Sequence, residues 1–309
     1  MRKALFLLLC AFSIPVQGHA DLSVGLMPAM NSIPLVVAEK AGFFSDFGVS
    51  VHLVPFSGQL ERETALQTGA IDGTISDMIN AIQAWTHGFG ARVTSVSEGS
   101  FSLLSAPGSK LASMADLRRP GGSVKTGLLQ SSIVNYLTQR MMESNGADPK
   151  RIDLVPIVAL PARLEMLLAG RIDAACLPEP LATVALARGA HRLADTDQMG
   201  TTPGVILFTA KALADKSNEV ARFYRAYDRA VAEINANGES YRGAIVAGCE
   251  FPPAARDLMR IPRFRRSFTP TEAQVSDVTA WMKENGLIST GPRYEEIVVR
   301  GFAADAGDQ

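Results

Sequence analysis

The apolar positions of residues 163–180 predict a helix, a tight turn and a short buried strand. Three leucines recur at helical spacing, and Gly170 follows where a helix end needs the left-handed conformation that glycine adopts most easily. Residues 172–177 then form an apolar run of strand length. The prolines at 178 and 180 cannot continue a central strand, because proline lacks the amide donor that a sheet requires. The segment therefore predicts a strand whose carboxyl end lies at the mouth of a cleft.

The same pattern occurs earlier in the chain, over residues 62–78. Five positions match when the earlier copy is shifted by 101 residues: Arg62 with Arg163, Leu66 with Leu167, Gly69 with Gly170, Ile71 with Ile172, and Asp72 with Asp173. A repeated helix, turn and strand predicts two lobes of the α/β class. In parallel α/β sheets ligands lie beyond the carboxyl ends of the strands, so the residues after each copy are expected to face a cleft.

The remaining pattern predicts further βα units on both sides of the repeat. Strands are expected at 22–27, 49–56, 92–97, 101–106, 123–127, 152–158, 191–194 and 205–208. Helices are expected at 33–41, 57–68, 78–85 and 131–144, with a short one from 113 and amphipathic ones at 214–236 and 271–285. The strand at 101–106 is predicted to cross between the lobes, and residues 199–204 to cross back. Lobe I is then 21–103 with 204–309, and lobe II is 104–203.

The first twenty residues have the pattern of a cleavable secretory signal peptide. Two basic residues precede the apolar run 4–14, and Gly18-His19-Ala20 has the small-x-small form of a cleavage site. The apolar run is too short to span a bilayer. Cys10 follows three leucines, unlike a lipoprotein cleavage site. We therefore expect a soluble periplasmic protein that begins at Asp21.

Composition narrows the range of partners. The chain has 309 residues, 47% of them apolar and 20% charged, which is ordinary for a globular protein. Without Arg2 and Lys3, 28 basic residues remain against 31 acidic ones, so neither nucleic acid nor an anionic membrane is expected as a partner. Only Cys176 and Cys249 remain after cleavage, and we expect both to be unpaired.

Motifs of catalysis and cofactor binding are absent from the sequence. It contains no phosphate-binding loop, no Gly-x-Gly-x-x-Gly, no His-Glu-x-x-His, no Cys-x-x-Cys and no Gly-x-Ser-x-Gly. The three histidines left after cleavage are scattered, so we expect no metal, no cofactor and no enzymatic activity. The arginine-rich residues 260–266 are interpreted as a solvated face, with docking of a partner as the alternative.

Polar residues at the predicted ends of strands are the candidate binding site. Helix starts leave backbone N–H groups that can hold a ligand's oxygen atoms. The alternative is that these side chains only cap helices. The candidates are Asn31, Ser32, Ser57, Ser76 and Asp77 in the first lobe, and Ser131, Ser132 and Glu179 in the second.

Several of these segments resemble the periplasmic substrate-binding proteins of ABC importers, in the group that binds sulfonates, taurine, nitrate and thiamine precursors. The matching segments are 33–44, 48–51, 65–72, 115–117, 167–174 and 179–180. The resemblance implies a type II periplasmic binding protein fold, with two α/β lobes joined by two crossing strands and a small solute trapped by hinge closure. It also implies a monomer that delivers the solute to permease subunits in the inner membrane.

Charge at the predicted cleft favours a ligand with a cationic or hydrogen-donating group, such as an amine or an amino-pyrimidine. Asp77 and Glu179 stand at its two walls, and no arginine or lysine occupies a strand end. Sulfonate binders often carry an aromatic-acid pair where this chain has Pro178-Glu179-Pro180. Three alternatives stay open: a binder of sulfonate or nitrate anions, a sensor that presents its ligand to a receptor, and an enzyme like the pyrimidine synthases of thiamine biosynthesis.

Overall fold

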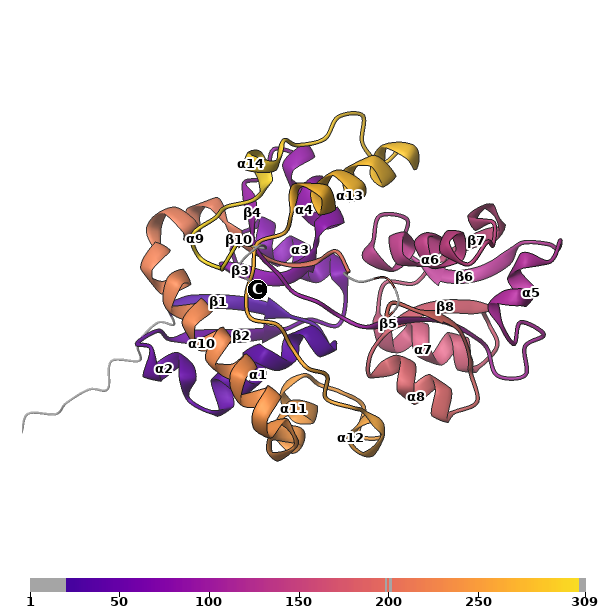
Figure 1. Ribbon diagram of the computed structural model, residues 1–309, viewed down its shortest axis with the longest axis horizontal. Coiled ribbons are helices and arrows are strands. Elements are labelled where there is room, and N and C mark those ends of the chain that lie inside the picture. Colours follow the sequence, from indigo (N-terminus) through magenta and orange to yellow (C-terminus); the bar gives the residue numbers. More distant parts are fainter. Residues whose placement is uncertain (1–20, 198, 200–201, 306–309) are drawn as a thin grey trace, which may run out of the picture.

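The computed structural model describes residues 21–197, 199 and 202–305, and it contains two five-stranded sheets that lie side by side (Figure 1). The first sheet has the order β2-β1-β3-β10-β4, and the second has the order β7-β6-β8-β5-β9. The strands of the first sheet are β1 (Leu22–Leu26), β2 (Val51–Pro55), β3 (Gly73–Asp77), β4 (Ala91–Val96) and β10 (Gly204–Thr209). Those of the second are β5 (Phe101–Ser105), β6 (Val124–Leu128), β7 (Ile152–Pro156), β8 (Ala174–Pro178) and β9 (His191–Asp195).

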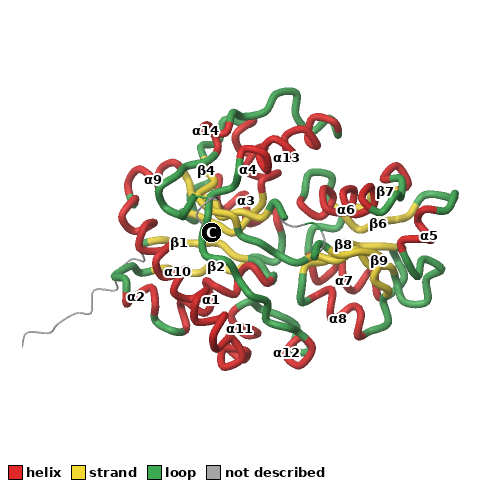
Figure 2. The backbone as a smooth tube through the Cα atoms, viewed as in Figure 1, coloured by secondary structure: helices red, strands yellow, loops and turns green. Residues whose placement is uncertain are grey.

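Helices cover both faces of each sheet (Figure 2). The first half of the chain contributes α1 (Ile33–Lys40), α2 (Phe43–Asp46), α3 (Gln59–Gln67), α4 (Met78–Thr86), α5 (Met114–Arg118) and α6 (Ile133–Ser144). The second half contributes α7 (Leu160–Leu168), α8 (Leu181–Ala187), α9 (Ala210–Asp215), α10 (Ser217–Asn237), α11 (Arg242–Gly248), α12 (Ala255–Leu258), α13 (Glu272–Glu284) and α14 (Tyr294–Ile297). Short 3-10 turns occupy Met30–Ser32, Pro149–Arg151 and Gly238–Tyr241.

The two sheets repeat one topology, as the sequence repeat predicted. In each sheet one strand, β1 or β6, lies between two strands that run parallel to it. The next strand of the sheet, β10 or β5, is antiparallel to its neighbour β3 or β8. The glycines of the repeat are left-handed, with φ of 73° at Gly69 and 63° at Gly170. The helix, turn and strand expected at each copy are confirmed.

Strand β5 corrects the predicted crossing at 101–106. All five of its residues pair with β8, so the strand belongs to the second sheet and does not run between the two sheets. The chain leaves the first sheet after Val96 and returns to it at Gly204. We therefore propose that lobe II begins near Phe101, two or three residues before the predicted boundary at 103/104.

The structure also bears on the expected long helix and on the cysteines. The helix expected at 214–236 is interrupted at Lys216, which has φ −127° and separates α9 from α10. The expected signal peptide, with Cys10, lies outside the described residues. Cys176 and Cys249 are both free, as expected, and no helix of the described residues has the length and apolar character needed to cross a membrane.

The core forms two apolar layers, and each layer spans both lobes. Strand β10 shows the principle, since Val205 and Leu207 point into one layer while Ile206 and Phe208 point into the other. One layer contains α1, α10, α7 and α8, and the other contains α3, α4, α13, α5 and α6. Strands buried on both faces explain the near-continuous apolar runs in the sequence.

Candidate functional site

A cavity lies between the lobes, where strands of both sheets end. It is bounded by the residues after β1 and β6 and by the last residues of β3 and β8. The lining residues are Met27, Ala29, Asn31, Gln59, Arg62, Ile75, Ser76, Asp77, Phe101, Leu129, Ser132, Ile133, Val134, Val158, Leu160, Arg163 and Pro178. This is the position that the topology of an open α/β sheet favours for a ligand.

Four of the eight sequence candidates line this cavity: Asn31, Ser76, Asp77 and Ser132. Asp77 caps α4, since its Oδ1 accepts the Asn80 backbone N–H at 3.0 Å and its Oδ2 accepts the Asn80 amide at 2.9 Å. Burial raises the pKa of Asp77 to about 6. Ser132 caps α6, and its hydroxyl donates to the Leu129 carbonyl at 2.6 Å.

Ser32 and Ser57 do not line the cavity. The Ser32 hydroxyl donates to the Met27 carbonyl at 2.7 Å, so it fixes the loop after β1 from behind. Ser57 is exposed, and the helix it was expected to cap begins after Gly58. Sequence spacing placed these serines close in sequence to lining residues, but it did not determine which side of each loop faces the cavity.

Ser131 and Glu179 also lie outside the lining. The Ser131 hydroxyl is buried and has no hydrogen-bond partner within the described residues. The Glu179 carboxylate accepts the Thr183 backbone N–H at 2.9 Å, so it caps the first turn of α8, and it lies 3.8 Å from Arg192. The carboxylate expected at the second wall therefore serves as a helix cap.

Two buried arginines line the cavity and were not among the candidates. Arg62 of α3 forms an ion pair of 2.6 Å with Glu63, and it donates to the Ser76 hydroxyl at 3.0 Å. The Ser76 hydroxyl in turn donates to Glu63 at 2.9 Å. The first-lobe guanidinium is therefore neutralised within its own lobe.

Arg163 of α7 is the second-lobe counterpart of Arg62, and it has no carboxylate partner in the described part of the chain. Its side chain donates to the carbonyls of Ile157 at 2.7 Å and Cys176 at 3.5 Å, and its Nε is buried without a partner. Leu164 stands where the first copy has Glu63. Burial lowers the pKa of Arg163 to about 10, which still leaves a cation at neutral pH.

The lobes meet across the mouth of the cavity. Gly58 and Ala159, which are equivalent positions in the sequence repeat, form an antiparallel backbone bridge between the lobes. The Gln59 amide donates to Asn80 of its own lobe at 2.7 Å and to the Ser131 carbonyl of the other lobe at 3.2 Å. These contacts join the two lobes beside the cavity.

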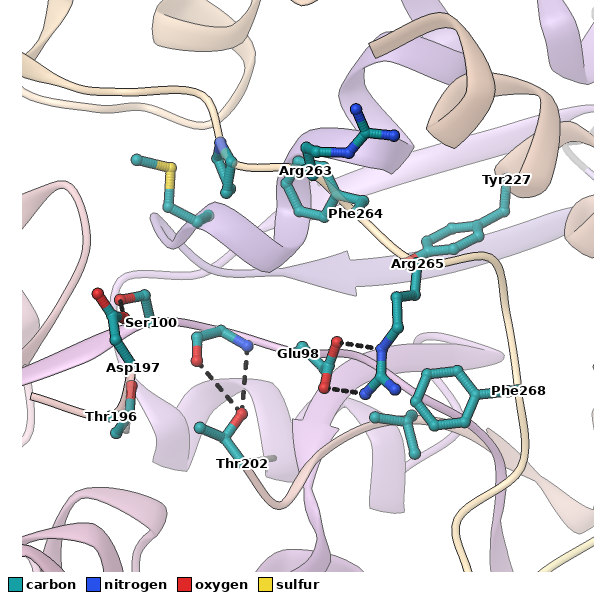
Figure 3. Close-up of a pocket in the computed structure, with 14 residues that line it drawn as sticks. Glu98, Ser100, Thr196, Asp197, Thr202, Tyr227, Arg263, Phe264, Arg265 and Phe268 are labelled. Atoms are coloured by element: carbon teal, nitrogen blue, oxygen red, sulfur yellow. Dashed lines mark hydrogen bonds and ion pairs between the residues drawn. The ribbon is translucent and has the colours of Figure 1, made fainter. Parts of the chain in front are cut away.

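The two connections between the lobes are braced by a segment from the C-terminal part of the chain. Figure 3 shows the pocket where this segment passes, with the Glu98 carboxylate facing the Arg265 guanidinium. Glu98 accepts two hydrogen bonds from Arg265, whose guanidinium lies 4.3 Å from the centre of the Phe268 ring. Gly99 of one connection donates its N–H to the hydroxyl of Thr202 of the other at 3.3 Å. At least one arginine of the 260–266 cluster therefore has an internal partner.

Comparison with protein families identifies the chain. A family model described as "NMT1/THI5 like" matches residues 29–240, more than half of the 309 residues. The protein belongs to the NMT1/THI5-like family. No curated protein sequence matches it at a significant level.

Solved structures share the fold of this NMT1/THI5-like protein. The alkanesulfonate-binding protein SsuA from Xanthomonas axonopodis pv. citri, bound to MOPS, has a TM-score of 0.75 and 20% identity, and the match covers 91% of this chain and 98% of that one. The nitrate-binding protein NrtA from Synechocystis PCC 6803 has a TM-score of 0.71 and 12% identity, with coverages of 87% and 82%. The desulfurization enzyme DszB has a TM-score of 0.65 and 15% identity, with coverages of 91% and 97%. The expected two-lobed periplasmic binding protein fold is confirmed.

The NMT1/THI5-like chain offers no nucleophilic cysteine at its cavity. None of the described cavity-lining residues is a cysteine. The Cys176 side chain is fully buried within β8, and burial raises its pKa to about 12. Among the described residues, no three His, Cys, Asp or Glu side chains converge in a way that would hold a metal ion.

Proposed function

We propose that this protein is a periplasmic solute-binding protein that captures a small anion between its lobes and delivers it to an ABC permease. The observation that carries the proposal is Arg163, a buried cation at the cavity with no carboxylate partner among the described residues. A buried charge without a counter-charge is costly, and an anionic ligand would supply one. The fold shared with sulfonate and nitrate binders supports this assignment.

This proposal replaces the amine or amino-pyrimidine ligand favoured by the sequence. That interpretation needed two free carboxylates and no cation at the cavity. Asp77 is occupied by Asn80 and Glu179 by Thr183, whereas Arg163 lines the cavity. Within the described lining, the buried side-chain atom left without a partner is the Arg163 Nε, which is a hydrogen-bond donor.

The rest of the lining limits the size and polarity of the ligand. Phe101, Val158, Leu160 and Ile133 give the cavity apolar walls. The N-terminus of α6, at Ser132, adds backbone N–H groups and the positive end of a twelve-residue helix. A short apolar group that carries one oxyanion fits this combination best.

Binding is favoured over catalysis on this fold. DszB shows that an enzyme can have the same fold. Within the described lining, however, no cysteine is present, and the nearby Cys176 thiol is buried with a raised pKa, so its reactive thiolate is disfavoured. The Ser76 hydroxyl of the lining donates to the Glu63 carboxylate, but the same carboxylate forms an ion pair with Arg62, so it is not a free base beside a nucleophile.

A thermal-shift and calorimetry panel tests the proposal, with short alkanesulfonates, nitrate and small carboxylates against amines and amino-pyrimidines. We expect anions alone to stabilise the protein, by about 2.7 kcal/mol at 100 times the dissociation constant. Arg163→Met is expected to weaken anion binding by about 100-fold or more, because truncating one member of a buried charge pair costs several kcal/mol.

Two variants make the result specific. Arg163→Lys keeps the charge and is expected to restore only part of the affinity, because lysine lacks the planar fork of guanidinium donors. Arg171→Met removes an exposed cation just after the same helix and should leave binding unchanged. If amines stabilise the native protein, and stabilise Arg163→Met equally well, the anion proposal is wrong and the cationic ligand is favoured again.

A further inference from the structure

Helix α13 of the first lobe reaches across to helix α6 of the second (Figure 1). It packs against α4 of its own lobe, which fixes its position. On the other side, the Asp277 carboxylate accepts a hydrogen bond from the Tyr136 hydroxyl and one of 2.9 Å from the Arg140 guanidinium. Both donors lie on α6. The carboxylate therefore joins the two lobes at a place outside the cavity lining.

A second set of contacts lies one turn further along α13 and involves the same stretch of α6. The Trp281 indole N–H donates to the Gln139 side chain at 2.9 Å, and the Gln139 amide donates to Asn285 at 3.1 Å. The Trp281 ring meets the Tyr136 ring edge-on, with centres 5.4 Å apart. Polar and aromatic contacts together make a continuous interface between α13 and α6.

Helix α6 links this interface to the cavity. Its N-terminal residues Ser132, Ile133 and Val134 line the cavity, and Tyr136 and Arg140 follow on the next turns of the same helix. Because a helix of this length moves as a rigid rod, holding its middle also places its first turn. A displacement of α6 away from α13 would open one wall of the cavity.

We propose that Asp277 is a positioning residue for solute binding, which holds α6 against α13 and so stabilises the closed arrangement of the lobes. This inference rests on the proposed function only in that closure serves binding. Within the described residues, both partners of the Asp277 carboxylate lie on the opposite lobe, so parting the lobes returns it to water. Its side chain is 51% exposed, which makes the contact weak enough to break reversibly.

The consequence for affinity follows from the closed population. If only the closed form binds tightly, the apparent dissociation constant is the intrinsic value divided by the closed fraction. Removal of the Asp277 contacts is expected to raise the ratio of open to closed protein by about fivefold, as the loss of a partly exposed ion pair and its hydrogen bond allows.

Electron–electron distance measurement on the ligand-free protein that begins at Asp21, and so lacks Cys10, tests this directly. Spin labels at Glu61→Cys and Ala162→Cys lie at exposed, equivalent positions of the two lobes near the mouth. The native Cys176 and Cys249 side chains are fully buried and need not be replaced. We expect Asp277→Asn and Tyr136→Phe each to move the distance distribution toward longer values.

The matched control is Asp215→Asn. It removes an ion pair with Lys211 that lies wholly within the first lobe and whose carboxylate is comparably exposed, at 54% against 51%, and it should leave the distribution unchanged. Circular dichroism verifies that each variant is folded. Unchanged distances in both Asp277→Asn and Tyr136→Phe, or an equal shift in Asp215→Asn, would overturn the inference. The measurement uses no ligand, so a failure of the anion panel leaves its outcome intact.

Discussion

Asp77 is a buried carboxylic acid whose titration should be visible in the stability of the protein. Burial raises its pKa from 3.8 to about 6, although the nearby Arg62 charge acts in the opposite direction. Between these pH values the folded protein binds more protons at this site than the unfolded chain does. Stability therefore falls as pH rises from about 4 to 6, by on the order of 2–3 kcal/mol for this group alone.

Urea unfolding at several pH values measures this effect against Asp77→Asn. Asparagine can still accept the capping hydrogen bond of α4, but it does not titrate. As pH rises from about 4 to 6, we expect the free energy of unfolding to fall more for the native protein than for the variant. Parallel pH profiles for the two proteins would show that folding does not raise the pKa of Asp77.

At the scale of single residues, the sequence placed four of its candidates in the cavity lining but missed both arginines. Asn31, Ser76, Asp77 and Ser132 were found because short side chains stay close to their backbone positions. Arg163 was missed because it lies in a helix and not at a strand end. Its long side chain nevertheless places the guanidinium at the cavity, several bonds from the Cα. The repeat had already aligned Arg163 with Arg62.

At the scale of elements, the repeated Gly-x-Ile-Asp turn has a structural role in both lobes. The Asp72 carboxylate accepts the Ser23 backbone N–H at 2.9 Å, and Asp173 accepts the Lys125 N–H at 2.8 Å. Both aspartates stand at the start of a strand, at the end of the sheet opposite the cavity. The motif therefore ties the start of one strand to the neighbouring strand. Its presence indicates the fold and does not identify the ligand.

The two aspartates are expected to differ in their contribution to stability. Asp72 also pairs with Lys216 at 2.9 Å, whereas among the described residues the Asp173 carboxylate has only the backbone donor. Asp173→Ala should cost about 0.5–1.5 kcal/mol of unfolding free energy, and Asp72→Ala about 0.2–1 kcal/mol more. Urea unfolding of the two variants measures the difference. In a Lys216→Met background the excess should vanish, and its persistence there would refute the role given to the ion pair.

The repeat predicted the element order well because its requirements are local. A left-handed glycine and the aspartate that follows it by three residues can be recognised from adjacent positions, and both recur at the same offset. The placement of β5 in the second sheet depends instead on pairing with β8 and β9, whose partner residues lie 69 to 93 positions away along the chain. No local pattern contains that information, so the expected crossing strand was wrong.

At the scale of the whole molecule, the two lobes share their cores. Each apolar layer contains residues of both sheets, and α12 contacts α8 while α13 contacts α6. Loss of one lobe would expose apolar surface of the other, at roughly 25 cal/mol for each Å². We therefore expect the lobes to unfold together, even though their topologies are separate and repeated.

The two free cysteines allow this cooperativity to be measured. Cys176 lies in the second lobe and Cys249 in the C-terminal part of the first, and both are fully buried with pKa values raised by burial. Native protein should therefore react with iodoacetamide very slowly, since a stability of 5 kcal/mol already reduces the open population by more than about 10³. Alkylation followed by peptide mass analysis across a urea series reports each thiol separately. Coincident midpoints are expected for the two cysteines. If Cys176 becomes reactive at a lower urea concentration than Cys249, the second lobe unfolds by itself and the shared layers do not couple the lobes.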